Sequence, residues 1–219
     1  MNIDDTKVRR GFFVALEGSD GSGKSTVFKA IKDRYAESGR GPGNMEIVFT
    51  REPGGTLIGE DIRDIILDKE NKEMSLRTEA LLYAASRAQH VDEKIRPALE
   101  EGKLVISDRY MLSSLAYQGA GRGLGLDKVY RLNYWATGGL MPDLTIFLDV
   151  DPIMVLRRKA VKVEKDRLEE AGDDFFKRVY NGYIESKKYM EKLISIDASK
   201  SQQEVIDSCI RALEGAIEK

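Results

Sequence analysis

The chain has 219 residues, of which 42% are hydrophobic and 33% are charged, a composition typical of a globular domain with its own core. Its net charge of −2 lacks the basic excess of a nucleic-acid-binding domain, and its one cysteine, Cys209, excludes an internal disulfide. The apolar runs fall well short of the ~20 residues of a membrane span, and the polar N-terminal stretch does not resemble a signal peptide. We therefore expect a cytoplasmic protein that binds neither nucleic acid nor membranes.

Short apolar runs alternate with longer amphipathic stretches, a pattern typical of a parallel sheet wrapped by helices. Strands are predicted at residues 11–17, 46–50, 103–107, 143–150 and 194–197. Helices are predicted at residues 24–38, 57–68, 76–101 with a bend near Pro97, 112–118, 126–137 and 202–218, with one more before the last strand. A glycine-rich loop is expected at 119–125. The pattern predicts an α/β fold with a five-stranded parallel sheet and helices on both faces, in a single domain over residues 1–219.

The first predicted strand runs into a glycine-rich turn that matches the P-loop pattern G-x-x-x-x-G-K-[ST]. The matching residues are Gly18, Ser19, Asp20, Gly21, Ser22, Gly23, Lys24 and Ser25. In a P-loop, backbone N–H groups surround nucleotide phosphates at the positive end of the following helix. Lys24 would neutralise the β- and γ-phosphates and Ser25 would bind Mg²⁺; with Thr26, these residues are the ATP-binding candidates. The alternative is a chance match, and a P-loop by itself serves kinases, switches and motors alike.

Four further segments narrow the function. They are residues 50–56 (TREPGGT), Arg63, residues 83–87 (YAASR) and residues 108–118 (DRYMLSSLAYQ). In order and spacing, these segments and the P-loop closely resemble the thymidylate kinases, from about residue 11 to residue 185. The resemblance implies a P-loop NTPase fold, transfer of the γ-phosphate of ATP to dTMP in dTTP biosynthesis, Mg²⁺ as cofactor, and a homodimer with residues 58–68, 76–101 and 126–137 as interface candidates.

Tyr83 and Arg87 are four residues apart on a predicted helix and therefore share a face. In the thymidylate kinases an aromatic residue at the first position stacks on the thymine ring, and an arginine at the second donates to its O4. A guanidinium only donates hydrogen bonds, so Arg87 would mismatch the amino group of cytosine. The family usually has Phe in place of Tyr83. From spacing alone, a core aromatic beside a surface arginine is the simpler interpretation.

Ser114, Tyr117 and Gln118 also fall on one helical face. The resemblance places Ser114 and Gln118 near N3 and O2 of the base. It places Tyr117 against the 2′ carbon of the sugar, which predicts a preference for deoxyribose, and it implies that Asp20 contacts the 3′-hydroxyl. Without the resemblance, these residues could simply be the solvent face of a helix.

Asp108 and Arg109 follow a predicted parallel strand, at the sheet edge where open α/β folds bind their ligands. The resemblance implies that Arg109 and Arg63 hold the phosphate of the acceptor. It also implies that Asp108 lies near Mg²⁺ and that Glu52 lies near both the phosphate and the metal. A structural salt bridge between Asp108 and Arg109 is the alternative.

A basic cluster follows the fourth predicted strand. Its members are Arg157, Arg158, Lys159, Lys162, Lys165 and Arg167. By resemblance, residues 157–172 are a short mobile lid over ATP, in which Arg158 and Arg167 join Lys24 and Arg109 in catalysis. Some thymidylate kinases carry an arginine in the P-loop where this chain has Gly21, so the chain resembles the bacterial-type branch. A solvated helix face is the alternative for such a charge run.

Three rival functions stay open. The chain could be a P-loop kinase for dUMP, dCMP or a free nucleoside, a nucleotide switch without phosphoryl transfer, or a family member that has lost activity. Arg63 and Arg109 favour an acceptor that already carries a phosphate, whereas the intact Lys24 and Ser25 speak against lost activity. His90, the only histidine, has no Cys or His cluster around it that would predict a zinc site, and Trp135 is expected in the core or in an interface.

Overall fold

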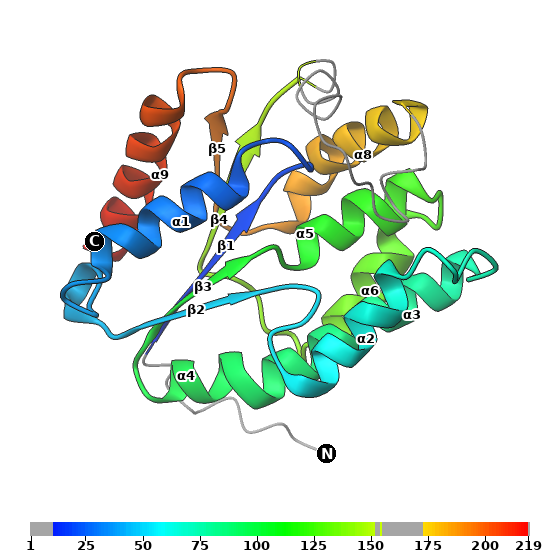
Figure 1. The fold of residues 1–219 in the computed structure, drawn as a ribbon, viewed down its shortest axis with the longest axis horizontal. Helices are drawn as coiled ribbons and strands as arrows, with labels where there is room; N and C mark the ends of the chain where they lie inside the picture. The colour runs from blue at the N-terminus through cyan, green and yellow to red at the C-terminus, as the bar shows by residue number, and fades with distance from the viewer. Residues whose placement is uncertain (1–10, 152–153, 155–172, 219) are drawn as a thin grey trace.

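The computed structural model describes residues 11–151, 154 and 173–218, and its centre is one sheet of five parallel strands in the order β2-β3-β1-β4-β5 (Figure 1). The strands are β1 (Phe12–Glu17), β2 (Ile47–Arg51), β3 (Leu104–Asp108), β4 (Leu144–Asp149) and β5 (Leu193–Asp197). The α-helices are α1 (Lys24–Tyr35), α2 (Leu57–Leu67), α3 (Leu76–His90), α4 (Arg96–Glu100), α5 (Met111–Ser114), α6 (Leu126–Ala136), α8 (Asp173–Ser186) and α9 (Gln202–Ile217). The α/β fold with a five-stranded parallel sheet is thus confirmed.

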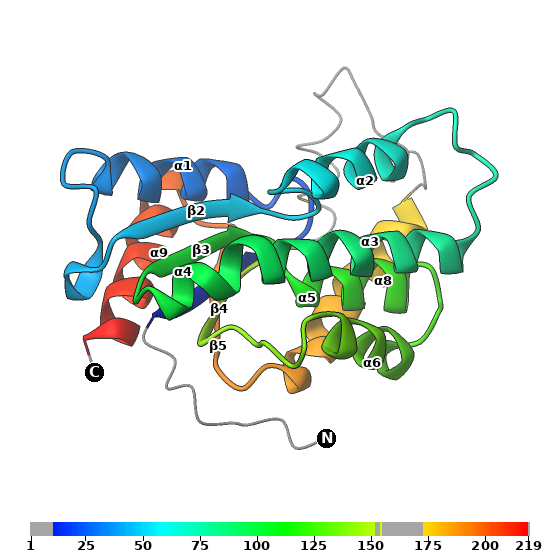
Figure 2. The same cartoon turned by 90° about the horizontal axis from the view of Figure 1, so that it is seen from below.

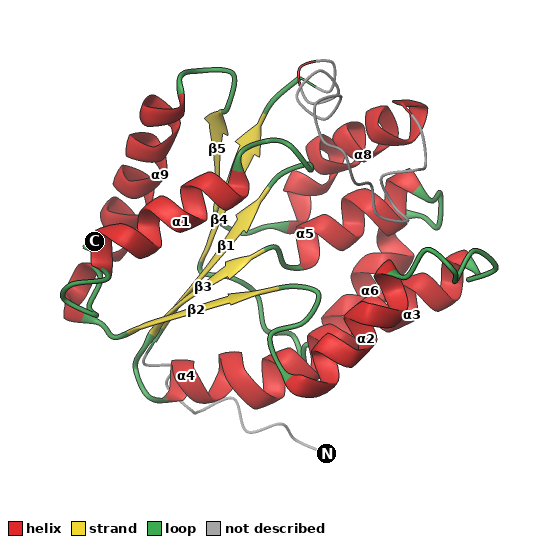
Figure 3. Cartoon of the chain, viewed as in Figure 1, coloured by secondary structure: helices red, strands yellow, loops and turns green. Residues whose placement is uncertain are grey.

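Helices cover both faces of the sheet because its strands are apolar on both sides (Figures 1 and 3). Along β1, Val14 and Leu16 pack on one face with α1 and α9, including the buried Cys209. Phe13 and Ala15 point the other way and pack with α4 and the segment before it. Beyond the sheet, α2 packs on α3 and α3 packs on α6 (Figure 2). These helices lie beside the carboxyl ends of β1, β2 and β3 and contribute Arg63, Tyr83 and Arg87 to the pocket there.

Two helical segments depart from regular α geometry. The long helix predicted at 76–101 is interrupted by a π-helical segment, η2 (Val91–Ile95), just before α4. Pro97 is in the first turn of α4, so the irregular segment precedes the proline near which a bend was predicted. The second π-helical segment, η3 (Leu115–Gly121), continues α5 into residues predicted as a glycine-rich loop. Here the backbone packs closely on α8, since a Cβ on Gly121 would lie 2.7 Å from Val179 Cγ2.

Two short 3₁₀ turns, η1 (Pro42–Asn44) and η5 (Lys187–Tyr189), complete the described elements. Trp135 is 82% exposed on α6, so its predicted place in the core of the chain is wrong, and an interface remains the prediction. No helix in the described part of the chain is both long and apolar enough to cross a membrane.

Candidate active site

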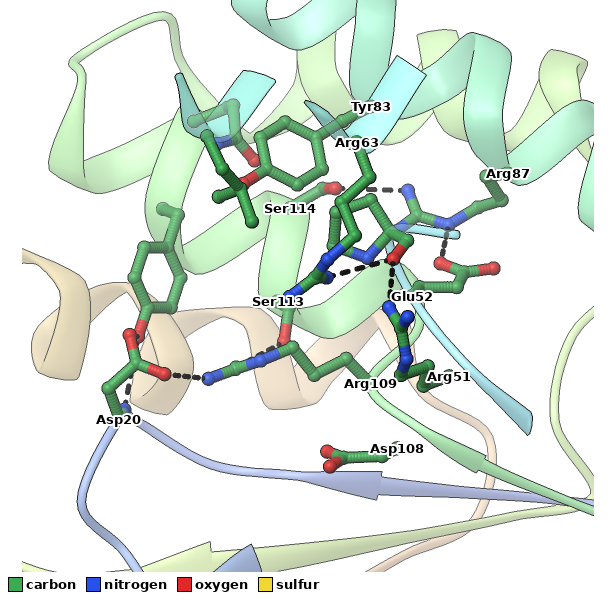
Figure 4. A pocket seen from close by; sticks show the side chains of 14 residues that line it. Asp20, Arg51, Glu52, Arg63, Tyr83, Arg87, Asp108, Arg109, Ser113 and Ser114 are labelled. Atoms are coloured by element: carbon green, nitrogen blue, oxygen red, sulfur yellow. Dashed lines mark hydrogen bonds and ion pairs between the residues drawn. The ribbon is translucent and has the colours of Figure 1, made fainter. Parts of the chain in front are cut away.

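A pocket lies at the carboxyl ends of β1, β2 and β3, the edge at which parallel α/β sheets bind ligands (Figure 4). It is lined by Asp20, Arg51, Glu52, Pro53, Arg63, Leu67, Tyr83, Arg87, Asp108, Arg109, Ser113, Ser114, Tyr117 and Gln118. All nine residues predicted to bind the acceptor are in this set, together with Asp108. They come from the P-loop, the loop after β2, α2, α3, the end of β3 and the residue after it, α5 and η3, so the fold brings together residues that are almost 100 positions apart in the sequence.

The P-loop lies beside this pocket, between β1 and α1. Gly18, Gly21 and Gly23 have φ angles of 150°, 86° and 100°, in the region that side chains rarely adopt. A Cβ on Gly18 would also lie 2.7 Å from Ser22 Oγ. The loop can therefore turn tightly and present its backbone N–H groups at the start of α1, which suits a phosphate ligand.

Lys24 is folded back over the P-loop. Its Nζ donates to the carbonyl oxygens of Gly18 (2.8 Å) and Ser19 (3.0 Å), and the residue is only 6% exposed. Burial, and then the nearby Arg109 guanidinium, lower the pKa of Lys24 to about 8. The ammonium remains predominantly protonated at pH 7, and an anionic ligand in the loop would favour its charged form further.

Arg109 joins the P-loop to the pocket. Its Nη1 donates to Gly18 O (2.9 Å), Ser113 Oγ (2.9 Å) and Tyr183 Oη (3.0 Å), and its Nη2 pairs with Asp20 (Figure 4). Its φ of 73° is unusual for a residue with a side chain. Gly18 O thus accepts from both Lys24 and Arg109, so the two cations meet at one carbonyl.

Glu17, at the end of β1, was not singled out in the sequence, although it helps to shape this edge. Its side chain is fully buried and accepts from the backbone N–H groups of Tyr110 (2.9 Å) and Ser113 (3.1 Å) and from the Ser113 hydroxyl. It therefore fixes the turn after β3 that carries Arg109. A charged residue closing an apolar strand was the signal that could have indicated it.

Arg87 is the centre of a buried polar network. Its Nε donates to Glu52 Oε2 (2.7 Å), its Nη1 to Ser114 Oγ (3.0 Å) and Asn133 Oδ1, and its Nη2 to Tyr110 O (3.0 Å). A guanidinium has five N–H donors, so among the described residues this network leaves one N–H on Nη2. Arg87 lines the pocket while only 2% exposed, so these hydrogen bonds hold its guanidinium in place at the pocket wall.

His90 holds the other side of Glu52. Its Nδ1 is 3.0 Å from Glu52 Oε1, and its Nε2 is 2.6 Å from Thr50 Oγ1. A carboxylate can only accept, so Nδ1 carries the proton, and in the neutral ring Nε2 accepts from the Thr50 hydroxyl. Both Glu52 oxygens are therefore engaged by protein donors. His90 therefore lies behind the pocket wall and holds Glu52 in place, a role that its position in the sequence did not indicate.

The other end of the pocket joins Tyr117 to the P-loop. The Tyr117 hydroxyl donates to Asp20 Oδ2 (2.7 Å) and accepts from Asp20 N (3.1 Å), and Arg109 lies over its ring at 5.4 Å. Burial and the adjacent carboxylate raise the pKa of Tyr117. The Tyr117 side chain therefore stays a neutral hydroxyl. Tyr117 and Asp20, which were predicted to border neighbouring carbons of the sugar, are in contact with each other.

Two more arginines, Arg51 at the end of β2 and Arg63 in α2, meet at the loop that joins these elements. The Glu52–Pro53 peptide is cis, and Pro53 O accepts from Arg51 Nη1 (3.0 Å) and Arg63 Nη1 (2.9 Å). Arg51 also pairs with Glu60 at 2.8 Å, on the start of α2. Arg63 and Arg109 therefore present two guanidinium groups to one pocket (Figure 4).

Asp108 and Ser25 were predicted to bind the metal. Asp108 Oδ1 is buried and has no hydrogen-bond partner among the residues that the structure describes, whereas Ser25 is exposed in the first turn of α1. Within the described part of the chain, no group of three His, Cys, Asp or Glu side chains could enclose an ion. A single carboxylate and a hydroxyl, completed by phosphates and water, suit Mg²⁺ better than a metal held by protein ligands alone. The predicted lid at 157–172, with Arg158 and Arg167, lies outside the described residues.

Comparison with known proteins identifies the family of the chain. The family model of thymidylate kinase matches residues 16–209. A thymidylate kinase of Finegoldia magna is 50% identical over 202 residues, which cover 92% of this chain and 97% of the relative. A thymidylate kinase of Lactobacillus helveticus is 51% identical over 208 residues, covering 94% and 96%. The chain belongs to the thymidylate kinase family.

Proposed function

We propose that the P-loop binds ATP, that the pocket binds dTMP, and that the γ-phosphate passes between them to give dTDP and ADP for dTTP synthesis. The observation that carries this proposal is the meeting of Lys24 and Arg109 at Gly18 O. Lys24 is expected to contact the phosphates of the donor, and Arg109 is expected to contact the phosphate of the acceptor. Their shared contact with Gly18 O places these two cations side by side. Membership of the thymidylate kinase family identifies the enzyme class, a nucleoside monophosphate kinase. We also propose that residues 1–219 form one kinase domain.

The base would bind between Tyr83 and the network around Arg87. Tyr83 is half-buried at the wall of the pocket and offers a ring on which the thymine can stack (Figure 4). The remaining Nη2–H of Arg87 would donate to O4 of the base, next to Ser114. Cytosine has an amino group at that position, so two donors would face each other. This arrangement favours thymine and uracil over cytosine.

The sugar would lie along the contact between Tyr117 and Asp20. Carbons 2′ and 3′ are adjacent in the ribose ring, and these two side chains are hydrogen-bonded to each other. Tyr117 would then fill the space of a 2′-hydroxyl, whereas the Asp20 carboxylate would accept from the 3′-hydroxyl. The contact therefore supports a preference for deoxynucleotides.

The phosphate of the acceptor would lie between Arg63 and Arg109, with Lys24 on the donor phosphates. The acceptor oxygen is already anionic, so transfer requires alignment and charge compensation rather than a strong base. Ser25 and Asp108 would hold Mg²⁺, the latter through water, and the ion would neutralise phosphate charge. Glu52 would contribute to acceptor binding indirectly, because it accepts a hydrogen bond from Arg87 and so fixes the position of that side chain. Arg158 and Arg167 would add positive charge from the predicted lid.

The test is ADP production by purified protein with ATP and Mg²⁺, using dTMP, dUMP, dCMP, UMP or thymidine as acceptor. We expect rapid turnover with dTMP, slower turnover with dUMP, and little with dCMP or thymidine. Dominant turnover of another monophosphate would keep the kinase and overturn the assignment of Arg87. ATP hydrolysis that does not depend on an acceptor would favour a nucleotide switch instead.

A cytoplasmic homodimer is part of this proposal. Helices α2, α3 and α6 lie next to one another and carry large exposed apolar side chains (Figure 2). These are Leu57, Ile58, Ile65, Leu76, Leu81, Tyr134 and Trp135. Such a concentration on neighbouring helices is typical of a surface that pairs with another protein.

Replacing Leu81, which is 56% exposed on α3, by Glu should therefore convert a dimer into a monomer, because it would bury a charge in the interface. Sedimentation velocity at micromolar concentration measures the change. Ile184→Glu on α8, at a site that is 38% exposed, is the matched control and should remain dimeric. A monomeric wild-type protein, or equal dissociation of both variants, would contradict the assignment of this interface.

A further inference from the structure

A buried carboxylate stands behind the predicted base site. Glu79, on α3, is fully buried, and its Oε1 accepts from Gln118 Nε2 at 3.1 Å. Arg122, just after η3, donates to the same carboxylate, from Nε to Oε1 and from Nη2 to Oε2, both at 3.2 Å. Gln118 is itself 1% exposed and lines the pocket. The three side chains therefore form one cluster that ends at the pocket wall.

The chemistry of this cluster determines which way the Gln118 amide faces. A side-chain amide carries a donor and an acceptor of nearly equal size, so shape alone does not orient it. Arg122 donates to both oxygens of Glu79, and a carboxylate paired with a guanidinium in this way offers only acceptors to its other neighbours. The NH₂ group of Gln118 must then face Glu79. The amide oxygen, Oε1, then lies on the side away from Glu79, where it can accept a hydrogen bond from a ligand.

We propose that Glu79 is a positioning residue for base selection: it holds Gln118 so that Oε1 accepts from N3–H of the pyrimidine. This inference rests on the proposed function. With the free N–H of Arg87, the pocket then offers one donor and one acceptor, the complement of O4 and N3–H in thymine and uracil. Cytosine carries an acceptor at N3 and a donor at C4, so both contacts fail. One of the two contacts that disfavour cytosine thus depends on Glu79, a residue behind the pocket wall.

The test is Glu79→Gln, which preserves size and removes the acceptor-only carboxylate. The Gln118 amide can then adopt either orientation. We expect kcat/KM for dTMP to fall by about tenfold, that for dCMP to stay level or rise, and KM for ATP to change by less than about twofold. The dTMP-to-dCMP ratio of kcat/KM is the readout, measured at least ten degrees below the melting temperature of each variant.

Two further variants separate positioning from a purely structural role. Arg122→Lys keeps a cation beside Glu79, so it should lower the melting temperature and keep the dTMP-to-dCMP ratio. In a Gln118→Ala background, Glu79→Gln should no longer change the ratio, because Glu79 acts through Gln118. Equal loss of the ratio in Arg122→Lys, or an undiminished effect of Glu79→Gln without Gln118, would overturn the proposal. An unchanged ratio in Glu79→Gln would do the same.

The wild-type enzyme separates this inference from the proposed function. If it prefers dTMP to dCMP and the Glu79 variants keep that preference, only the role of Glu79 fails. If it phosphorylates no pyrimidine monophosphate, the proposed function fails, and the inference fails with it.

Discussion

Replacing Lys24 by Met should lower kcat with dTMP by at least about a hundredfold, the scale seen when one pre-aligned donor to transition-state charge is removed. Lys24 lies 2.8 Å from Gly18 O at the start of α1, where the donor phosphates would bind. Met preserves the length of the side chain and removes its charge. The melting temperature should stay within a few degrees of wild type, because burial already disfavours the ammonium, as its lowered pKa of about 8 indicates.

Lys29→Met is the matched control for this variant. Lys29 is exposed on the same helix and, within the described residues, pairs only with Asp33, one turn further along. Steady-state kinetics should therefore return wild-type values for this control. If Lys24→Met kept more than half of the wild-type kcat, Lys24 would have no part in phosphoryl transfer, and the assignment of the P-loop as the ATP site would fail.

Replacing Arg109 by Lys should lower kcat/KM for dTMP by about a thousandfold, while KM for ATP changes much less. Lysine keeps the charge but loses the planar fork that reaches Gly18, Ser113 and Asp20 together. The acceptor phosphate would then be held loosely, and misplacement of about 1 Å can lower rates a hundredfold. Arg109 also pairs with Asp20, so the variant should weaken binding at the sugar end as well.

Arg34→Lys is the control for the chemical change. Arg34 also donates two hydrogen bonds to a carboxylate, that of Glu214 in α9. It lies in the last turn of α1, at the end of this helix away from the P-loop. Initial rates over a range of dTMP and ATP concentrations separate the two KM values. A fall in kcat/KM for ATP as large as that for dTMP would place Arg109 on the donor rather than on the acceptor.

Much of the fold was predictable because its signals are local. The apolar runs that form β1 and β4 lie within one or two residues of their predicted bounds. The glycines of the P-loop stand at positions with positive φ, which only glycine adopts readily. The resemblance to thymidylate kinases also selected the acceptor residues, all of which line one pocket. Their individual roles remain predictions.

Contacts between distant residues could not be predicted from the sequence. Glu17, Glu79 and His90 are buried polar residues whose partners lie about 40 to almost 100 positions away. A periodic pattern shows that a residue belongs to a strand or helix, but not which donor it meets across the fold. The π-helical segment η3 is a further case, since its helical turns depend on close packing against α8 rather than on the glycine-rich sequence.

The most direct test of phosphoryl transfer to dTMP is ³¹P NMR of purified protein with equal concentrations of ATP and dTMP and excess Mg²⁺. We predict that dTDP and ADP signals grow in equal amounts as ATP and dTMP signals decline, with no inorganic phosphate above the rate seen without dTMP. Growth of inorganic phosphate in place of dTDP, or ADP formed without loss of dTMP, would contradict the account.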